Sequence, residues 1–364
     1  VGSEMCIRDR AGHVGVNLVE KLRIKKDAQV KAVLLPGESV PYEGAENVEI
    51  VYGDVTDRDF LKSIVEKDSI FIHMAGIIDI SAGNKSLVYK VNVSGTENAA
   101  EVALENKVKR FVYTSSVHVI EPVAGSVMTE PTVFDESRIT GDYAKSKTIA
   151  TAKVFDAISR GLDGVVVYPS GIIGPMDYKV SNTGELFVEI INRKVKASVK
   201  GGYNFVDVRD VADGIIAAAE KGRRGEGYIL SGGDISVDGI YAAVRSMTGE
   251  KKRAPKLAGW FVRLFAYPAE LWFRMRGKKP LFTKYSLYTL TSPHNFSCAK
   301  AQKELGYSPR RPEESIRDTV KWFYFNKPEL FGKKALKRLK KRLEPSGASF
   351  RPTLGKKAYY KKNK

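Results

Sequence analysis

The residues with the most evident chemistry are Tyr143 and Lys147, which stand four positions apart. In a helix this spacing places two side chains on the same face, one turn apart. An ammonium group beside a phenol favours the ionised phenol, because an opposite charge stabilises the charged form. Tyr143 is therefore a candidate acid/base. Because Tyr-x-x-x-Lys also arises by chance, its weight depends on the elements that position it.

Strands and helices alternate around this pair. Apolar runs that predict buried strands are found at 29–35, 48–52, 69–74, 110–116, 164–168 and 228–232. Helical spacing of apolar or small residues between some of them indicates an α/β protein with a parallel, doubly wound sheet. Ser116 ends one strand and leaves 27 positions for a loop before Tyr143. A hydroxyl at a strand end can be a helix cap or a functional group.

Gly12 and Gly15 lead into a helix predicted over residues 16–22, since the apolar residues at 14, 18, 19 and 22 have helical spacing. Glycines at such a place allow a pyrophosphate to approach the helix N-terminus, and a simple tight turn is the alternative. The second strand ends in Leu35, Pro36 and Gly37. These residues supply neither the acid that holds ribose hydroxyls nor the arginine that suits a 2′-phosphate, so they leave the choice between NAD and NADP open.

The composition is that of a globular protein, with 43% hydrophobic and 28% charged residues. Of the net charge of +18, +12 lies in residues 333–364, so the body of the chain is not strongly basic. Two cysteines allow no disulfide framework and no zinc spacing is present, which favours a reducing cytoplasm. No uncharged apolar run reaches 18 residues, so a spanning helix is not expected.

The two ends of the chain are unusual. Residues 1–10 show no strand period and resemble translated sequencing-adapter sequence, so we expect a non-native segment in place of the first strand. Residues 331–364 are expected to form a basic, disordered tail, in which 333–342 could be an amphipathic helix. A solvated tail is the simplest interpretation, and weak contact with RNA or an anionic lipid surface is the alternative.

Residues 11–175 and 205–234 are expected to form a dinucleotide-binding domain, and 176–204 with 235–330 a substrate lobe. Within the lobe, residues 257–275 are aromatic and amphipathic. They could wall a substrate pocket or lie on a membrane surface.

In this order the motifs from Ala11 to Trp322 resemble the extended short-chain dehydrogenase/reductase superfamily, also called NAD-dependent epimerase/dehydratase. Within it the chain looks like the dihydroflavonol 4-reductase-like and 3β-hydroxysteroid dehydrogenase-like branch. The resemblance implies a Rossmann-like fold with a smaller, mostly helical substrate lobe. It also implies that Ser116, Tyr143 and Lys147 are catalytic, with Lys147 lowering the pKa of Tyr143. The implied cofactor-binding residues are Gly12, His13, Val14, Gly15, Asp54, Val55, Ala75, Gly76, Lys147, Pro169 and Ser170.

The resemblance further implies NAD or NADP as cofactor and a small carbonyl or alcohol substrate, with His118 and Phe205 as candidate substrate contacts. The segment 205–212 matches a motif that packs the lobe onto the nucleotide domain, and similar proteins often form homodimers. Val117 and His118 after Ser116 disfavour a dehydratase, and Tyr168 to Pro175 lack the epimerase pattern. The first hypothesis is thus reversible reduction of a ketone on a moderately apolar substrate. A nucleotide-sugar epimerase and a non-catalytic dinucleotide- or RNA-binding protein are the alternatives, and no specific nucleic acid is expected.

Overall fold

The computed structural model describes residues 4–8, 12–25, 28–78, 84–195, 197–250, 255–257 and 284–344. Its larger part is a seven-stranded sheet in the order β10-β6-β5-β4-β1-β2-β3, with every neighbouring pair parallel. The strands are β1 (Glu4–Arg8), β2 (Gln29–Leu34), β3 (Val48–Tyr52), β4 (Ile70–His73), β5 (Arg110–Thr114), β6 (Gly164–Pro169) and β10 (Gly227–Leu230). The strand order reverses direction between β1 and β4, which is where open α/β sheets bind ligands.

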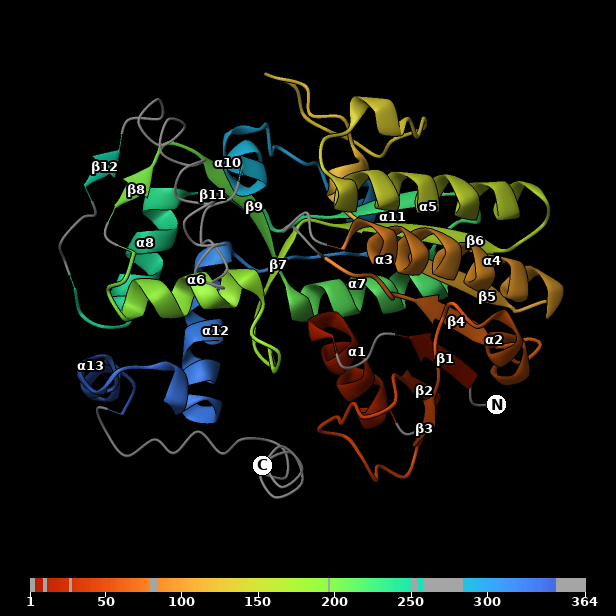
Figure 1. Cartoon of the computed structure of the whole chain (residues 1–364), viewed down its shortest axis with the longest axis horizontal. Coiled ribbons are helices and arrows are strands. Elements are labelled where there is room, and N and C mark those ends of the chain that lie inside the picture. The colour runs from red at the N-terminus through yellow and green to blue at the C-terminus, as the bar shows by residue number, and fades with distance from the viewer. Residues whose placement is uncertain are drawn as a thin grey trace.

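Helices cover both faces of this sheet (Figure 1). One face packs against α1 (His13–Ile24), α7 (Val208–Lys221) and α11 (Ala299–Leu305). The other packs against α2 (Arg58–Ile64), α4 (Gly95–Glu105) and α5 (Asp142–Ser159). The predicted doubly wound, Rossmann-like class is confirmed.

The central strand β1 corrects the expectation that the first strand is missing. Residues Glu4–Arg8 pair with β2 on one side and β4 on the other, and Met5 and Cys6 are buried. The apolar run Met5-Cys6-Ile7 is short, and a central strand buried on both faces needs a continuous apolar run rather than an alternating pattern. Residues 4–8 therefore occupy the position of the first strand in the sheet.

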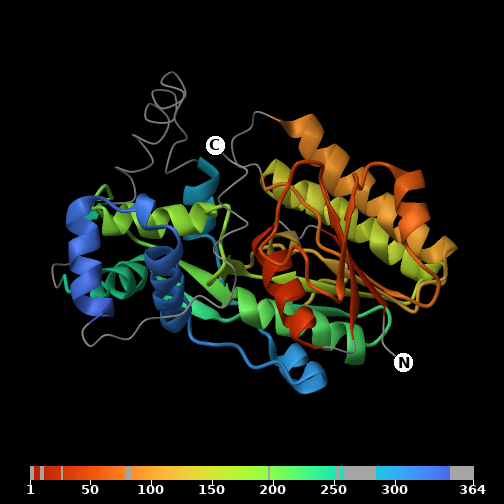
Figure 2. The ribbon, with the colours of Figure 1, turned by 90° about the horizontal axis from the view of Figure 1, so that it is seen from below.

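A smaller lobe lies beside the sheet domain (Figure 2). It contains the sheet β11-β9-β7 and a separate core. Its strands are β7 (Gly171–Ile173), β9 (Gly202–Asp207) and β11 (Gly233–Ser236), and its helices include α6 (Asn182–Ile191), α8 (Val237–Ser246), α12 (Pro312–Asn326) and α13 (Lys333–Leu343). The segment after Pro169, which the sequence suggests as a turn, thus continues into a short strand.

Three domain limits differ from the sequence prediction. The segment up to residue 343 is not disordered, because α13 buries Ala335 and Leu339 in the lobe core. Helix α11 packs on the sheet domain rather than the lobe, since Ala301 and Leu305 join that core. The predicted limit at residue 205 divides β9 between the two domains, whereas the whole strand lies in the lobe sheet.

In the aromatic segment 257–275, Leu257 ends β12 (Lys256–Leu257), which pairs with β8 (Ser198–Val199), and 258–275 lie outside the described residues. Within the described segments, none of the helices combines the length and apolar character that crossing a bilayer requires.

Candidate active site

A cavity of about 660 Å³ lies between the carboxyl ends of the sheet and the smaller lobe. Most of the predicted site residues line it: Gly12, His13, Val14, Gly76, Ser116, His118, Tyr143, Lys147, Pro169, Ser170 and Phe205. Four predicted cofactor residues are not in its wall. Gly15, Val55 and Ala75 are buried behind it, and Asp54 is an exposed residue whose carboxylate accepts from the Thr56 N–H at 2.9 Å.

Helix α5 brings Tyr143 and Lys147 to the cavity on one face, as their spacing predicts. Tyr143 is 9% exposed and Lys147 is 3% exposed. The helix begins after Gly141, whose φ of 97° lies in the left-handed region that glycine adopts without strain.

The Lys147 ammonium is held at the ends of β4 and β5. Its Nζ donates to the Thr114 carbonyl oxygen at 2.9 Å and to the Tyr113 hydroxyl at 3.3 Å. A side chain at Gly76 would place its Cβ 3.2 Å from this Nζ. Gly76 therefore keeps the space beside the ammonium free, and here the glycine serves close approach rather than backbone freedom.

The Tyr143 phenol lies beside Ser116. Burial raises the pKa of Tyr143 to about 12, and a hydrogen bond with Ser116 acts in the opposite direction. The expected lowering of this pKa by Lys147 is not seen in this structure, where burial outweighs the hydrogen bond with Ser116. Near neutral pH the phenol is protonated and can donate.

His118 is the neighbour of this pair on the substrate side. Its ring meets the Tyr143 ring edge to face, with centroids 6.2 Å apart, and its backbone N–H donates to the Ser116 hydroxyl oxygen at 3.3 Å. Burial lowers the pKa of His118 to about 4, so the imidazole is neutral near pH 7.

Asn92 supports the site from behind. It is fully buried in a π-helical turn, Lys90–Ser94, a geometry often found at functional sites. Its side chain accepts from the Ile77 N–H at 2.8 Å and donates to the Ser146 hydroxyl at 3.0 Å. Ser146 in turn donates to the Tyr143 carbonyl at 2.7 Å. This chain of contacts ties the turn at Gly76 to helix α5, which spacing alone does not reveal.

The other end of the cavity offers an anion site. Helix α1 begins after Gly12 without a side-chain cap and without an acid in its first turn, and Gly12, His13 and Val14 line the cavity. Free N–H groups and the helix dipole at such a terminus favour a phosphate group. The residues present therefore fit the pyrophosphate of a dinucleotide.

Glu38 was missed because the prediction considered only residues 35–37. Its carboxylate folds back to the end of β2, where it accepts from the Leu35 N–H at 3.1 Å. The same carboxylate also pairs with the Lys179 ammonium at 2.6 Å. An acid thus stands where ribose hydroxyls are bound in dinucleotide folds.

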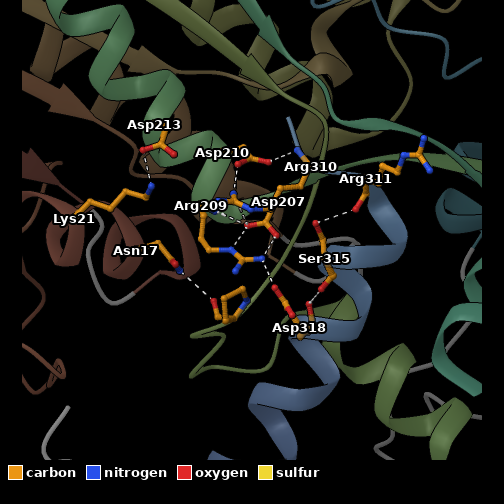
Figure 3. A network of polar contacts seen from close by, with 12 residues as sticks. Asn17, Lys21, Asp207, Arg209, Asp210, Asp213, Arg310, Arg311, Ser315 and Asp318 are labelled. Atoms are coloured by element: carbon orange, nitrogen blue, oxygen red, sulfur yellow. Dashed lines mark hydrogen bonds and ion pairs between the residues drawn. The ribbon is translucent and has the colours of Figure 1, made fainter. Parts of the chain in front are cut away.

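A buried polar network joins the two parts of the protein next to the cavity (Figure 3). Asp207 ends β9 and accepts from the backbone N–H of Arg209 and from Nε and Nη2 of its guanidinium, which also reaches Asp318 on α12 at 2.6 Å. Arg310 binds Asp210 through its backbone N–H and its side chain. This arrangement agrees with the predicted packing role of residues 205–212.

Comparisons with known proteins agree with this geometry. The family model described as 3-beta hydroxysteroid dehydrogenase/isomerase matches residues 8–225. A "Putative dihydroflavonol 4-reductase" of Synechocystis sp. is 32% identical over 319 residues, covering 86% of this chain and 92% of that protein. "Sterol demethylase protein B" of Methylococcus capsulatus is 29% identical, covering 86% and 95%. The crystal structure of gox2253 superposes with a TM-score of 0.78 at 30% identity, covering 90% of this chain and 99% of that chain.

Fold, cavity and comparisons lead to one assignment. The chain belongs to the 3-beta hydroxysteroid dehydrogenase/isomerase family and is an NAD(P)-dependent enzyme of the extended short-chain dehydrogenase/reductase type.

Proposed function

We propose that this protein interconverts a ketone and a secondary alcohol on a moderately apolar substrate, with Ser116, Tyr143 and Lys147 as catalytic residues. The observation that carries the proposal is their meeting in one cavity whose other end is the free N-terminus of α1. When bound, NAD(P) supplies the carbon that gives or takes the hydride.

The residues of this chain then handle the proton. Ser116 donates a hydrogen bond to the carbonyl oxygen, and Tyr143 gives that oxygen its proton. Because the pKa of Tyr143 is raised to about 12, its resting form is the acid, which suits the direction of reduction. Lys147 would hold the nicotinamide ribose of a bound cofactor, and its positive charge stabilises the phenolate that remains when the proton leaves.

The cavity wall favours an apolar substrate over a nucleotide sugar. Its substrate side is built from aliphatic and aromatic side chains: Ile78, Ile120, Ile139, Leu186, Ile190, Tyr203, Phe205, Ile240, Tyr241, Tyr288, Leu290 and Phe296. Among the described wall residues, the lysines are Lys147 and Lys179, and arginine is absent. Lys147 is held by the Thr114 carbonyl and Lys179 by Glu38. The diphosphate of a nucleotide sugar would therefore find few cations here.

The cofactor that we propose is NAD rather than NADP. A 2′-phosphate would face the Glu38 carboxylate at the end of β2, whereas ribose hydroxyls can donate to it. Lys179 neutralises part of the Glu38 charge. The preference for NAD over NADP therefore requires that the ribose hydroxyls replace Lys179 as the partner of Glu38.

The test is a fluorescence titration with NADH and NADPH, followed by turnover on a panel of apolar ketones. Tyr143→Phe should bind NADH as the natural sequence does and lose at least about 1,000-fold in kcat, since it lacks the proton donor. Tyr203→Phe is the matched control, because it removes a phenol from the same cavity away from Ser116.

Three results would contradict the proposal, and two of them would favour an alternative. A tightly retained dinucleotide with no net consumption of NADH would indicate an epimerase. Full activity of Tyr143→Phe would remove the catalytic role of the tyrosine, and NADH binding without turnover on any carbonyl compound would favour a non-catalytic binding protein.

A further inference from the structure

Helix α13 has one apolar side, and that side is already occupied. Ala335 and Leu339 are buried in the lobe core, and Leu336 and Leu343 pack against it. The helix lies at the outer edge of the lobe beside α12 (Figure 1). The helix is thus a folded part of the protein, and only its outward face is accessible to a partner.

That outward face consists of lysines. At about 100° per residue, Lys333, Lys334, Lys337, Lys340 and Lys341 fall within an arc of about 120° that points away from Ala335 and Leu339. All five are exposed. The helix is about 16 Å long and contains no acidic residue, so five positive charges share one short surface. We call these five residues the lysine face of α13.

The lysine face is unfavourable for the isolated protein. Lys337 has like-charged neighbours three or four positions away on both sides, and such pairs destabilise a helix. Arg338 points to the lobe, where it donates to the Ile191 carbonyl at 3.0 Å, and does not relieve this repulsion. A planar anionic partner would relieve it at all five positions.

We propose that the lysine face of α13 docks the protein on an anionic lipid surface. Charge complementarity is the first argument, since a cluster of four to eight cations on an amphipathic helix is the pattern that anionic headgroups bind. The second is that the face carries no aromatic side chain on which a base could stack, as single-stranded nucleic acids require. The third rests on the proposed function, because a moderately apolar substrate partitions into membranes.

The experiment is co-sedimentation of the full chain with vesicles of phosphatidylglycerol and phosphatidylcholine, and with vesicles of phosphatidylcholine alone. Three variants each replace five lysines by glutamine and so have the same net charge. The first alters the lysine face. The second alters exposed lysines elsewhere, Lys67, Lys107, Lys109, Lys221 and Lys303, and the third alters the tail lysines 356, 357, 361, 362 and 364.

We expect binding to the anionic vesicles only, and a weakening by salt. Each lysine near such a surface contributes about fivefold, or about 3,000-fold for five, so the first variant should lower the partition coefficient by about three orders of magnitude. The second variant should change it by less than about tenfold.

Three outcomes would overturn the proposal. They are equal binding by the first and second variants, loss of binding in the third variant but not the first, and tighter binding of a uridine oligonucleotide than of the vesicles. NADH titration of the same samples separates this result from the proposed function, since a protein that binds NADH but no vesicles refutes only the docking surface.

Discussion

The Asp207 carboxylate between the two parts of the protein gives a prediction whose size follows from its contacts. Asp207 is 1% exposed, and it accepts from the Arg209 N–H at 2.8 Å, from its Nε at 2.8 Å and from its Nη2 at 2.7 Å. In Asp207→Asn the amide oxygen can still cap α7, so the cap energy of about 1 kcal/mol is retained. The two charge-assisted hydrogen bonds to the Arg209 guanidinium are lost.

The loss should be large because Arg209 is itself three-quarters buried, with 26% of its side chain exposed. Removing one partner of a buried ion pair costs about 3 kcal/mol of unfolding free energy, since the other charge loses its buried partner. Asp318 contacts the same guanidinium, but 35% of its side chain is exposed. Asp318→Asn should therefore cost only about 0.5 to 1 kcal/mol.

Urea unfolding at pH 7, followed by circular dichroism, measures both variants. The pKa of Asp207 adds a second reading: burial raises it, but the hydrogen bonds and charge of Arg209 outweigh burial and lower it. Its stabilisation is thus present above the unfolded pKa of about 4 and is lost as the pH falls below that value. Equal costs for the two variants, or a cost below about 1 kcal/mol for Asp207→Asn, would refute the reasoning.

Three further predictions concern the cavity. Lys147→Met should abolish turnover and weaken NADH binding in a fluorescence titration, and activity above about a tenth of the natural value would contradict its role. Between pH 7 and pH 4 the natural protein should lose about 2 to 3 kcal/mol more stability than His118→Gln, because its buried imidazole, with a pKa of about 4, must gain a proton on unfolding. Parallel loss in urea unfolding would argue against this. Glu38→Gln should lower the ratio of NADPH to NADH dissociation constants at least about fivefold, with Lys179→Gln as the comparison, and an unchanged ratio would exclude Glu38 as the discriminating group.

The sequence predicted what depends on local spacing. The four-residue spacing of Tyr143 and Lys147 placed both on one helix face, and the alternation of strands and helices predicted the parallel sheet and the strand that ends near Ser116. These features follow from periodicity and from the rule that strand ends share one edge of a parallel sheet.

Other features depend on tertiary contacts that no local pattern encodes. Asn92 contacts Ser146 from 54 positions away, and Glu38 acts at the end of β2 only because its side chain folds back. Likewise the sequence of α13 resembles part of a basic tail, and only the structure shows that Ala335 and Leu339 pack in the lobe core. The raised pKa of Tyr143 also required the structure, since burial rather than charge spacing decides it.

The central claim is net hydride transfer at the cavity with Tyr143 as proton donor. The most direct measurement is a single turnover with NADH that carries deuterium at both C4 positions and an apolar ketone, analysed by mass spectrometry of the product. We expect deuterium on the carbinol carbon of the alcohol with the natural sequence and none with Tyr143→Phe. An alcohol without deuterium, or labelled product from both proteins, would contradict the account.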